Sequence, residues 1–96
     1  MILTERQTER GLLVAACDDG LIGETFENGD VTLTVNEEFY GGDEVTPETV
    51  VESLANASVA NLVGTEVVEL AIEEGYVDEG NVLDLDGALH AQFLRL

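Results

Sequence analysis

The sequence predicts an α+β protein in which a small mixed or antiparallel sheet carries two helices packed on one face. One observation is the order of hydrophobic patterns: strand-like segments come first, two helical segments follow, and strand-like segments close the chain. A second is a pair of hairpin turn signals, Asn28-Gly29 and Asp86-Gly87. The third is the length of 96 residues, which predicts one domain over residues 1–96.

The predicted strands fall into three groups along the chain. Residues 2–7 form the first strand, and residues 12–17 are a short continuous apolar run, which is typical of a buried strand. Residues 31–35 alternate between apolar and polar side chains, so their odd-numbered side chains are expected to face inward. Residues 81–86 and 88–95 form the closing hairpin.

Two helices are predicted in the middle of the chain. The first begins at Thr46-Pro47-Glu48, where Thr46 caps the helix and proline suits its first position, and it ends near residues 56–58. The second is predicted over residues 59–74, with Gly75 as its stop. Its apolar residues recur at helical spacing: Val59, Leu62, Val63, Val67, Leu70 and Ala71.

Charge is the strongest compositional signal. The chain has 21 Asp and Glu against three basic residues, which gives a formal net charge of -18. Electrostatic screening reaches about 8 Å at physiological salt and only about 3 Å at 1 M, so repulsion between these carboxylates is relieved in molar salt. Because apolar residues make up a regularly patterned 45%, we interpret the acidity as adaptation to high salt rather than disorder or mimicry of nucleic acid.

The expected location is the cytoplasm, and no membrane contact is expected. No stretch approaches the roughly 20 apolar residues that span a bilayer, and no secretory signal opens the chain. Cys17 is the only cysteine, which excludes an intrachain disulfide and a cysteine-cluster zinc site. No metal site and no cofactor is predicted.

Cys17 and His90 are the residues on which catalysis could rest. A cysteine at a strand end with a distant histidine can form a nucleophilic pair. Asp18 and Asp19 follow the cysteine, however, and would raise the pKa of its thiol. We therefore favour a buried core role for Cys17 and assign no catalytic residue. A small enzyme using this pair is the less favoured alternative.

Phe39, Tyr40, Gly41 and Gly42 form a candidate binding loop. Aromatic residues are only 5% of the chain, yet two of them stand together before a Gly-Gly turn. Exposed aromatic rings stack on bases or anchor a protein partner, and glycine allows another backbone to approach. The alternative is a loop that folds its aromatic rings onto the core.

Three further polar residues, Asn61, His90 and Gln92, complete the candidate site. The argument for Asn61 starts from Gly64, which lies inside the predicted second helix, where glycine costs about 1 kcal/mol relative to alanine, so a close neighbour of Gly64 is expected. Asn61 stands one turn earlier and is placed to hydrogen-bond across that gap. His90 and Gln92, on the last predicted strand, are candidate hydrogen-bonding residues.

Several separate segments resemble the DUF424 family of uncharacterised archaeal proteins. They follow the family in order over essentially the whole chain: Val14-Ala15-Ala16-Cys17-Asp18, Glu38-Phe39-Tyr40-Gly41-Gly42, Ala60-Asn61-Leu62-Val63-Gly64 and His90-Ala91-Gln92. The resemblance implies a small archaeal α+β protein, and the acidity then implies a haloarchaeal member. It also implies an RNA-binding role, which is sometimes attached to this family, but no catalytic residues.

The leading hypothesis from the sequence is a non-enzymatic binding module that contacts RNA or a ribonucleoprotein. The residues proposed for this contact are Phe39, Tyr40, Gly41, Gly42, Asn61, His90 and Gln92. The alternative is a protein–protein interaction module, without nucleic acid, that uses an open sheet edge or a helix face.

Overall fold

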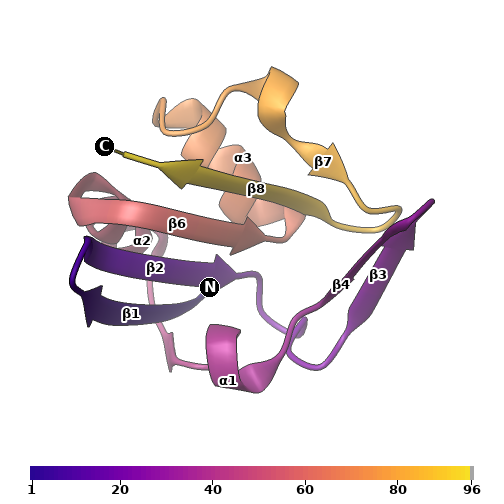
Figure 1. Cartoon of the computed structure of the whole chain (residues 1–96), viewed down its shortest axis with the longest axis horizontal. Helices are drawn as coiled ribbons and strands as arrows, with labels where there is room; N and C mark the ends of the chain where they lie inside the picture. The colour runs from indigo at the N-terminus through magenta and orange to yellow at the C-terminus, as the bar shows by residue number, and fades with distance from the viewer. Residues whose placement is uncertain (96) are drawn as a thin grey trace.

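A six-stranded sheet forms the centre of the molecule in the computed structural model, which describes residues 1–95 (Figure 1). Its strand order is β5-β1-β2-β6-β8-β7. The strands are β1 Ile2–Thr8, β2 Gly11–Cys17, β5 Asp43–Glu44, β6 Ala57–Val63, β7 Leu83–Asp84 and β8 Leu89–Leu94. A separate two-stranded sheet consists of β3 Thr25–Asn28 and β4 Val31–Thr34. The helices are α1 Glu37–Tyr40, α2 Pro47–Asn56, α3 Thr65–Glu73 and a short 3-10 turn, η1 Glu79–Asn81.

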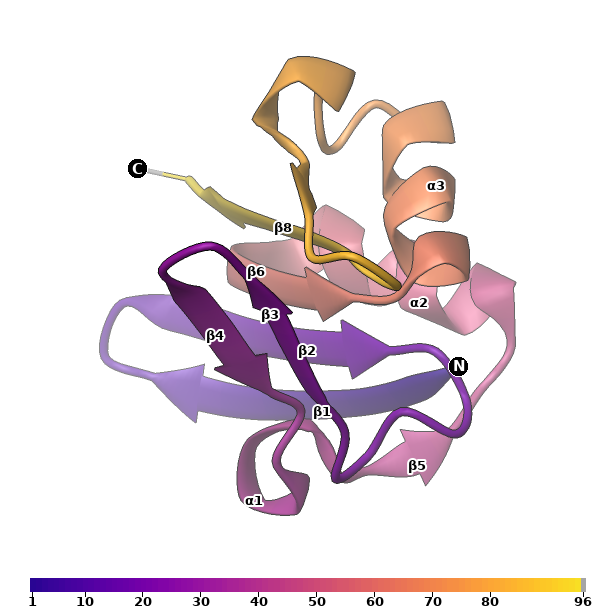
Figure 2. The same ribbon diagram turned by 90° about the vertical axis from the view of Figure 1, so that its right-hand side faces the viewer.

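The predicted fold class is confirmed. β2 pairs parallel to β6, and β1 and β8 flank these two strands antiparallel, so the sheet is mixed. Both α2 and α3 lie on the same face of this sheet, behind it in Figure 1 and to one side in Figure 2. Among residues 1–95, every helix is too short or too polar to cross a lipid bilayer.

The main core lies between the sheet and these two helices. The cap of α2 is as the sequence indicates: the Thr46 side chain accepts a hydrogen bond from the Thr49 amide, and Pro47 occupies the first turn. The helices then bury one apolar stripe each against alternate residues of the strands. The buried residues of this core include Val14, Ala16, Val50, Leu54, Ala60, Leu62, Val67, Val68, Ala71 and Ala91.

The predicted second helix over residues 59–74 is wrong in its first half. Residues 57–63 form strand β6, Gly64 turns the chain with a φ of 126°, and α3 occupies only Thr65–Glu73. β6 lies between β2 and β8 and is covered on both faces at its carboxyl end, so it reads as an almost continuous apolar run. Periodicity alone does not separate such a strand from a buried helix.

A smaller core lies on the opposite face of the sheet. The β3–β4 hairpin and α1 cross over one end of that face (Figure 2). Val35, which follows β4, and Tyr40 of α1 are buried in one cluster with Ala15, Cys17 and Val63 of the sheet. The segment expected to be a loop around the two aromatic residues is therefore partly the helix α1, which Asn36 caps at its amino end.

Both hairpin turns are confirmed, although the strand predicted over residues 81–86 is limited to β7, Leu83–Asp84. Asn28 pairs with Val31 across a two-residue loop, and Gly29 adopts a φ of 63°. In the second hairpin Asp86 and Gly87 both have positive φ, which this turn type requires, and the Leu85 amide donates to the Ala88 carbonyl at 2.8 Å. The odd-residue face of 31–35 is inward only in part, because Val35 is buried whereas Val31 is 42% exposed.

Candidate functional site

Asn61, His90 and Gln92, three of the binding residues predicted from the sequence, lie on the face of the sheet that α2 and α3 leave uncovered. Strand register arranges the side chains of this face in rows that run across the sheet. The first row is Ile2, Cys17, Val63 and His90; the second is Thr4, Ala15, Asn61 and Gln92; the third is Arg6, Leu13, Val59 and Leu94.

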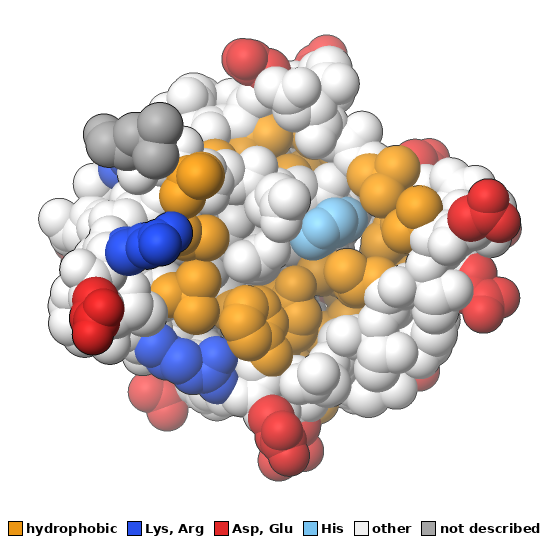
Figure 3. All heavy atoms as spheres, viewed as in Figure 1, with side chains coloured by type: hydrophobic (Ala, Val, Ile, Leu, Met, Phe, Trp, Pro, Cys, Tyr) orange, Lys and Arg blue, Asp and Glu red, His pale blue; other side chains and the backbone are white. Residues whose placement is uncertain are grey.

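Only part of this face is covered. The smaller core covers Ile2, Cys17 and Val63 in the first row and Ala15 in the second. The remaining residues of the second and third rows, with His90 beside them, form what we call the open face. It holds Thr4, Arg6, Leu13, Val59, Asn61, His90, Gln92 and Leu94, all partly buried or exposed. None of these residues is acidic, although the chain carries 21 Asp and Glu. Figure 3 shows this side of the molecule, where hydrophobic side chains and the histidine occupy the middle, basic side chains lie toward the left, and acidic ones lie at the rim.

Asn61 and Gln92 form the polar centre of the open face. They stand directly opposite each other on β6 and β8. Because the Leu89 carbonyl accepts from the Gly64 amide, register makes Asn61 and Gln92 a non-hydrogen-bonded pair, whose side chains lie closest together. Asn61 is partly buried and Gln92 exposed, so both amides reach solvent.

His90 adjoins this pair and has a defined orientation. Its Nδ1 lies 2.9 Å from the Leu62 carbonyl oxygen, which only accepts. In the neutral ring the proton is therefore on Nδ1, and Nε2 remains as a hydrogen-bond acceptor. Two amides and an imidazole acceptor thus lie together on adjoining strands.

Cys17 does not pair with His90. Val63 of β6 separates them in the same row, and two strand spacings amount to about 10 Å, well beyond hydrogen-bond reach. Cys17 is completely buried, and burial, aided by the neighbouring Asp18, raises the pKa of its thiol to about 11. A neutral, enclosed thiol is a core residue rather than a nucleophile.

The aromatic residues of the candidate loop fold onto the protein. Tyr40 is buried, and burial raises the pKa of its hydroxyl to about 12. Phe39 lies edge to face against it, with ring centroids 5.0 Å apart. The Arg6 guanidinium lies 5.3 Å from the centre of the Phe39 ring. Phe39 therefore borders the open face, whereas Tyr40 does not reach it.

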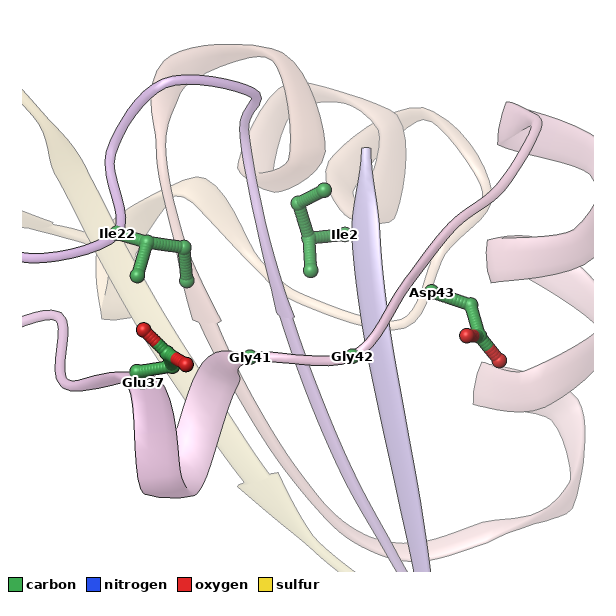
Figure 4. A pocket seen from close by; sticks show the side chains of 6 residues that line it. All are labelled: Ile2, Ile22, Glu37, Gly41, Gly42 and Asp43. Carbon is green, nitrogen blue, oxygen red and sulfur yellow. The ribbon is translucent and has the colours of Figure 1, made fainter.

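Gly41 and Gly42 allow close backbone packing. A Cβ on Gly41 would meet the Glu37 carbonyl, and one on Gly42 would meet the Leu3 carbonyl of β1. A hollow of about 530 Å³ lies beside this segment (Figure 4). Its wall is apolar at Ile2 and Ile22, while Glu37 and Asp43 lie on opposite sides of the glycine pair and do not converge. Within residues 1–95 no cluster of His, Cys, Asp and Glu is arranged to hold a metal ion.

Gly64 meets a neighbour, as its sequence position suggested, but the neighbour is Asp18. The Asp18 carboxylate accepts hydrogen bonds from the Glu66 amide at 2.9 Å and the Val67 amide at 2.8 Å, so it caps α3 from the end of β2. A Cβ on Gly64 would collide with this carboxylate. Asn61 lies on a strand and does not bridge the glycine. The available signals for the cap were the Asp after an apolar strand and the unexplained glycine.

The arrangement defines a small α+β protein whose open face carries no acidic side chain. The chain belongs to the family described as protein of unknown function (DUF424), whose model matches residues 5–96. The match covers almost the whole chain.

The fold also occurs in a solved structure, the crystal structure of an uncharacterized conserved protein from Methanopyrus kandleri. That protein is 23% identical, with a TM-score of 0.78, and the alignment covers 99% of this chain and 92% of the other. No curated protein matches the chain. The similarity establishes the fold that the two proteins share.

Proposed function

We propose that this protein is a non-enzymatic cytoplasmic binding module, adapted to high salt, that contacts RNA alone or within a ribonucleoprotein through the open face. The observation that carries the proposal is the absence of acidic side chains from the open face of a chain with a net charge of -18. In molar salt the screening length falls to about 3 Å, so carboxylates repel phosphate groups only at contact distance. A face without carboxylates is therefore the surface of this protein on which a nucleic acid can be in direct contact without that repulsion.

The chemistry of the open face suits unpaired bases. Amide side chains and an imidazole acceptor hydrogen-bond to base edges, which single-stranded RNA exposes. Asn61, Gln92 and His90 supply these groups side by side. Leu13 and Val59 offer apolar contact in the adjoining row, and Arg6 supplies one positive charge at the border with Phe39.

Crosslinking to RNA in molar potassium chloride tests the proposal. The informative variant is Asn61→Ala/Gln92→Ala, because both side chains reach solvent and their loss leaves the core intact. A variant of Tyr40 would instead disrupt the smaller core. Loss of about one to two hydrogen bonds predicts roughly a tenfold drop in RNA recovered.

The matched control is Gln7→Ala/Asn56→Ala, which removes two exposed amides outside the open face. It should recover as much RNA as the wild type. Equal recovery from the wild type and the Asn61→Ala/Gln92→Ala variant would falsify the assignment of the open face. A protein partner that survives nuclease, with no RNA recovered from the wild type, would replace RNA with a protein–protein role.

The adaptation to salt has its own measurement. Repulsion among the carboxylates falls as the screening length shrinks from about 10 Å at 0.1 M to about 3 Å at 1 M. The melting temperature should therefore rise steadily with potassium chloride over that range. A melting temperature that does not change with salt contradicts the adaptation, whatever the outcome for RNA.

A further inference from the structure

The outer edge of β8 is unpaired over half its length. The Leu89 carbonyl accepts from Gly64 and the Arg95 amide donates to Ser58, so the odd-numbered residues of β8 direct their backbone groups to β6. The even-numbered residues direct their backbone amides and carbonyls away from β6, toward the outer edge. β7 pairs with the strand only at Leu89 and His90, which leaves the backbone groups of Gln92 and Leu94 without a neighbouring strand within residues 1–95.

Over residues Gln92 to Leu94 this edge lacks the features that prevent strand addition. Exposed edges are normally blocked by charges, proline or a covering segment. The opposite edge strand, β1, has Glu5 and Arg6 along it, and β5 covers its first residues. The unpaired part of β8 is uncharged over Gln92-Phe93-Leu94, and Leu94 is 65% exposed. A hollow of about 400 Å³, lined by Val59, Gln92, Phe93 and Leu94, adjoins it.

We infer that two copies of this chain pair through the outer edges of their β8 strands. Free amides and carbonyls on an extended strand are satisfied by another extended strand. Antiparallel pairing about a two-fold axis at Phe93 sets Gln92 of each copy opposite Leu94 of the other, so that each unpaired group finds a partner.

Charge favours a second copy at this place. Two copies of the chain, each with a formal net charge of -18, repel each other. Direct contact between them is therefore most favourable where the facing strands carry no carboxylate. The pairing strands meet this condition, and pairing covers the most exposed large hydrophobic side chain of the described residues, Leu94. The joined sheets then present two open faces on one side as a single longer surface. The inference does not depend on RNA binding.

The test is the mass of the full chain in molar potassium chloride, measured by sedimentation from about 1 µM to about 1 mM, a range suited to a short interface. The wild type should approach twice the monomer mass as concentration rises, and Leu94→Glu should remain monomeric. Hydrogen exchange at the Gln92 and Leu94 amides should slow at high concentration in the wild type only.

Val31→Glu is the matched control, because it places the same charge at another exposed apolar residue, on the hairpin of the second sheet. It should dimerise like the wild type. A wild type that stays monomeric throughout this range overturns the inference, as does a Leu94→Glu variant that dimerises normally. Equal loss of dimer in Val31→Glu also overturns it, because added charge would then be the cause.

Discussion

The two faces of the central sheet are built from the same strands but carry different chemistry. Residues that face α2 and α3 are mainly apolar, as in Val14, Ala16 and Leu62, with one polar contact at the edge, where the Ser53 hydroxyl of α2 donates to the Glu5 carboxylate at 2.7 Å. Residues of the opposite face change along the strands. They are apolar at Cys17 and Val63, where the β3–β4 hairpin covers them, and polar at Asn61 and Gln92, where nothing does among the described residues. The first face therefore holds the main core, whereas the second holds the smaller core at one end and leaves its other end open to solvent.

The sharpest contrast between the faces is between two neighbours on β6. Leu62 is fully buried under the helices, and Leu62→Ala should lower the free energy of unfolding by about 2–5 kcal/mol through lost burial and a residual cavity. Asn61→Ala, one residue earlier on the open face, should change it by less than about 0.5 kcal/mol. Denaturant unfolding in molar salt measures both, and equal losses would contradict the division between the faces.

The covered end of the second face should respond to alkaline pH. Burial raises the pKa of the Cys17 thiol from its ordinary value of 9.0 to about 11. As the pH rises, the thiol therefore ionises in the unfolded state before it ionises in the folded state. Its contribution to stability is present below pH 9 and is lost as pH rises through about 11, up to roughly 2–3 kcal/mol. Tyr40 acts in the same direction at higher pH, since burial raises its pKa to about 12.

The measurement is the free energy of unfolding from neutral pH to about pH 11 in the wild type and in Cys17→Ala. The variant should lose less stability over this range, because it lacks the thiol that the unfolded state ionises first. Parallel pH profiles for the two proteins would show that Cys17 is not enclosed as described.

A smaller effect on stability is expected from the cap of α3, which lies at the carboxyl ends of β2 and β6. Asp18→Ala removes the acceptor of the Glu66 and Val67 amides and should cost about 1–2 kcal/mol in molar salt. Asp18→Asn keeps an acceptor oxygen and should cost less. Asp30→Ala, at an exposed turn, removes the same charge without a cap and should be close to neutral. If Asp30→Ala costs as much as Asp18→Ala, the charge rather than the cap is responsible.

Sequence reasoning succeeded where the determinants are local. The cap at Thr46-Pro47 and the turns at Gly29 and Asp86-Gly87 depend on the backbone preferences of a few adjacent residues. It failed for β6, because this central strand is mainly apolar, with residues buried on both faces at its carboxyl end, and the spacing of its apolar residues happened to match that of α3.

The residues of the candidate site could be chosen from the sequence, but their arrangement in space could not. Asn61, His90 and Gln92 were singled out individually, but their convergence depends on the register between β6 and β8, which has no local signature. Tyr40 was placed in a binding loop, whereas α1 turns it into the smaller core. The cap of α3 escaped prediction because its acceptor, Asp18, lies 48 residues before the amide of Glu66.

That distant cap has a consequence for how the chain folds. The parallel pairing of β2 with β6 closes a long loop, which is entropically costly before stabilising contacts form. The Asp18 carboxylate can bind the first turn of α3 only when these two strands are in register, and that turn lacks a cap of its own because its N-cap residue is Gly64. Strand alignment and initiation of α3 are therefore one cooperative step. Residues of β2, β6 and α3 should belong together to the nucleus that sets the folding rate.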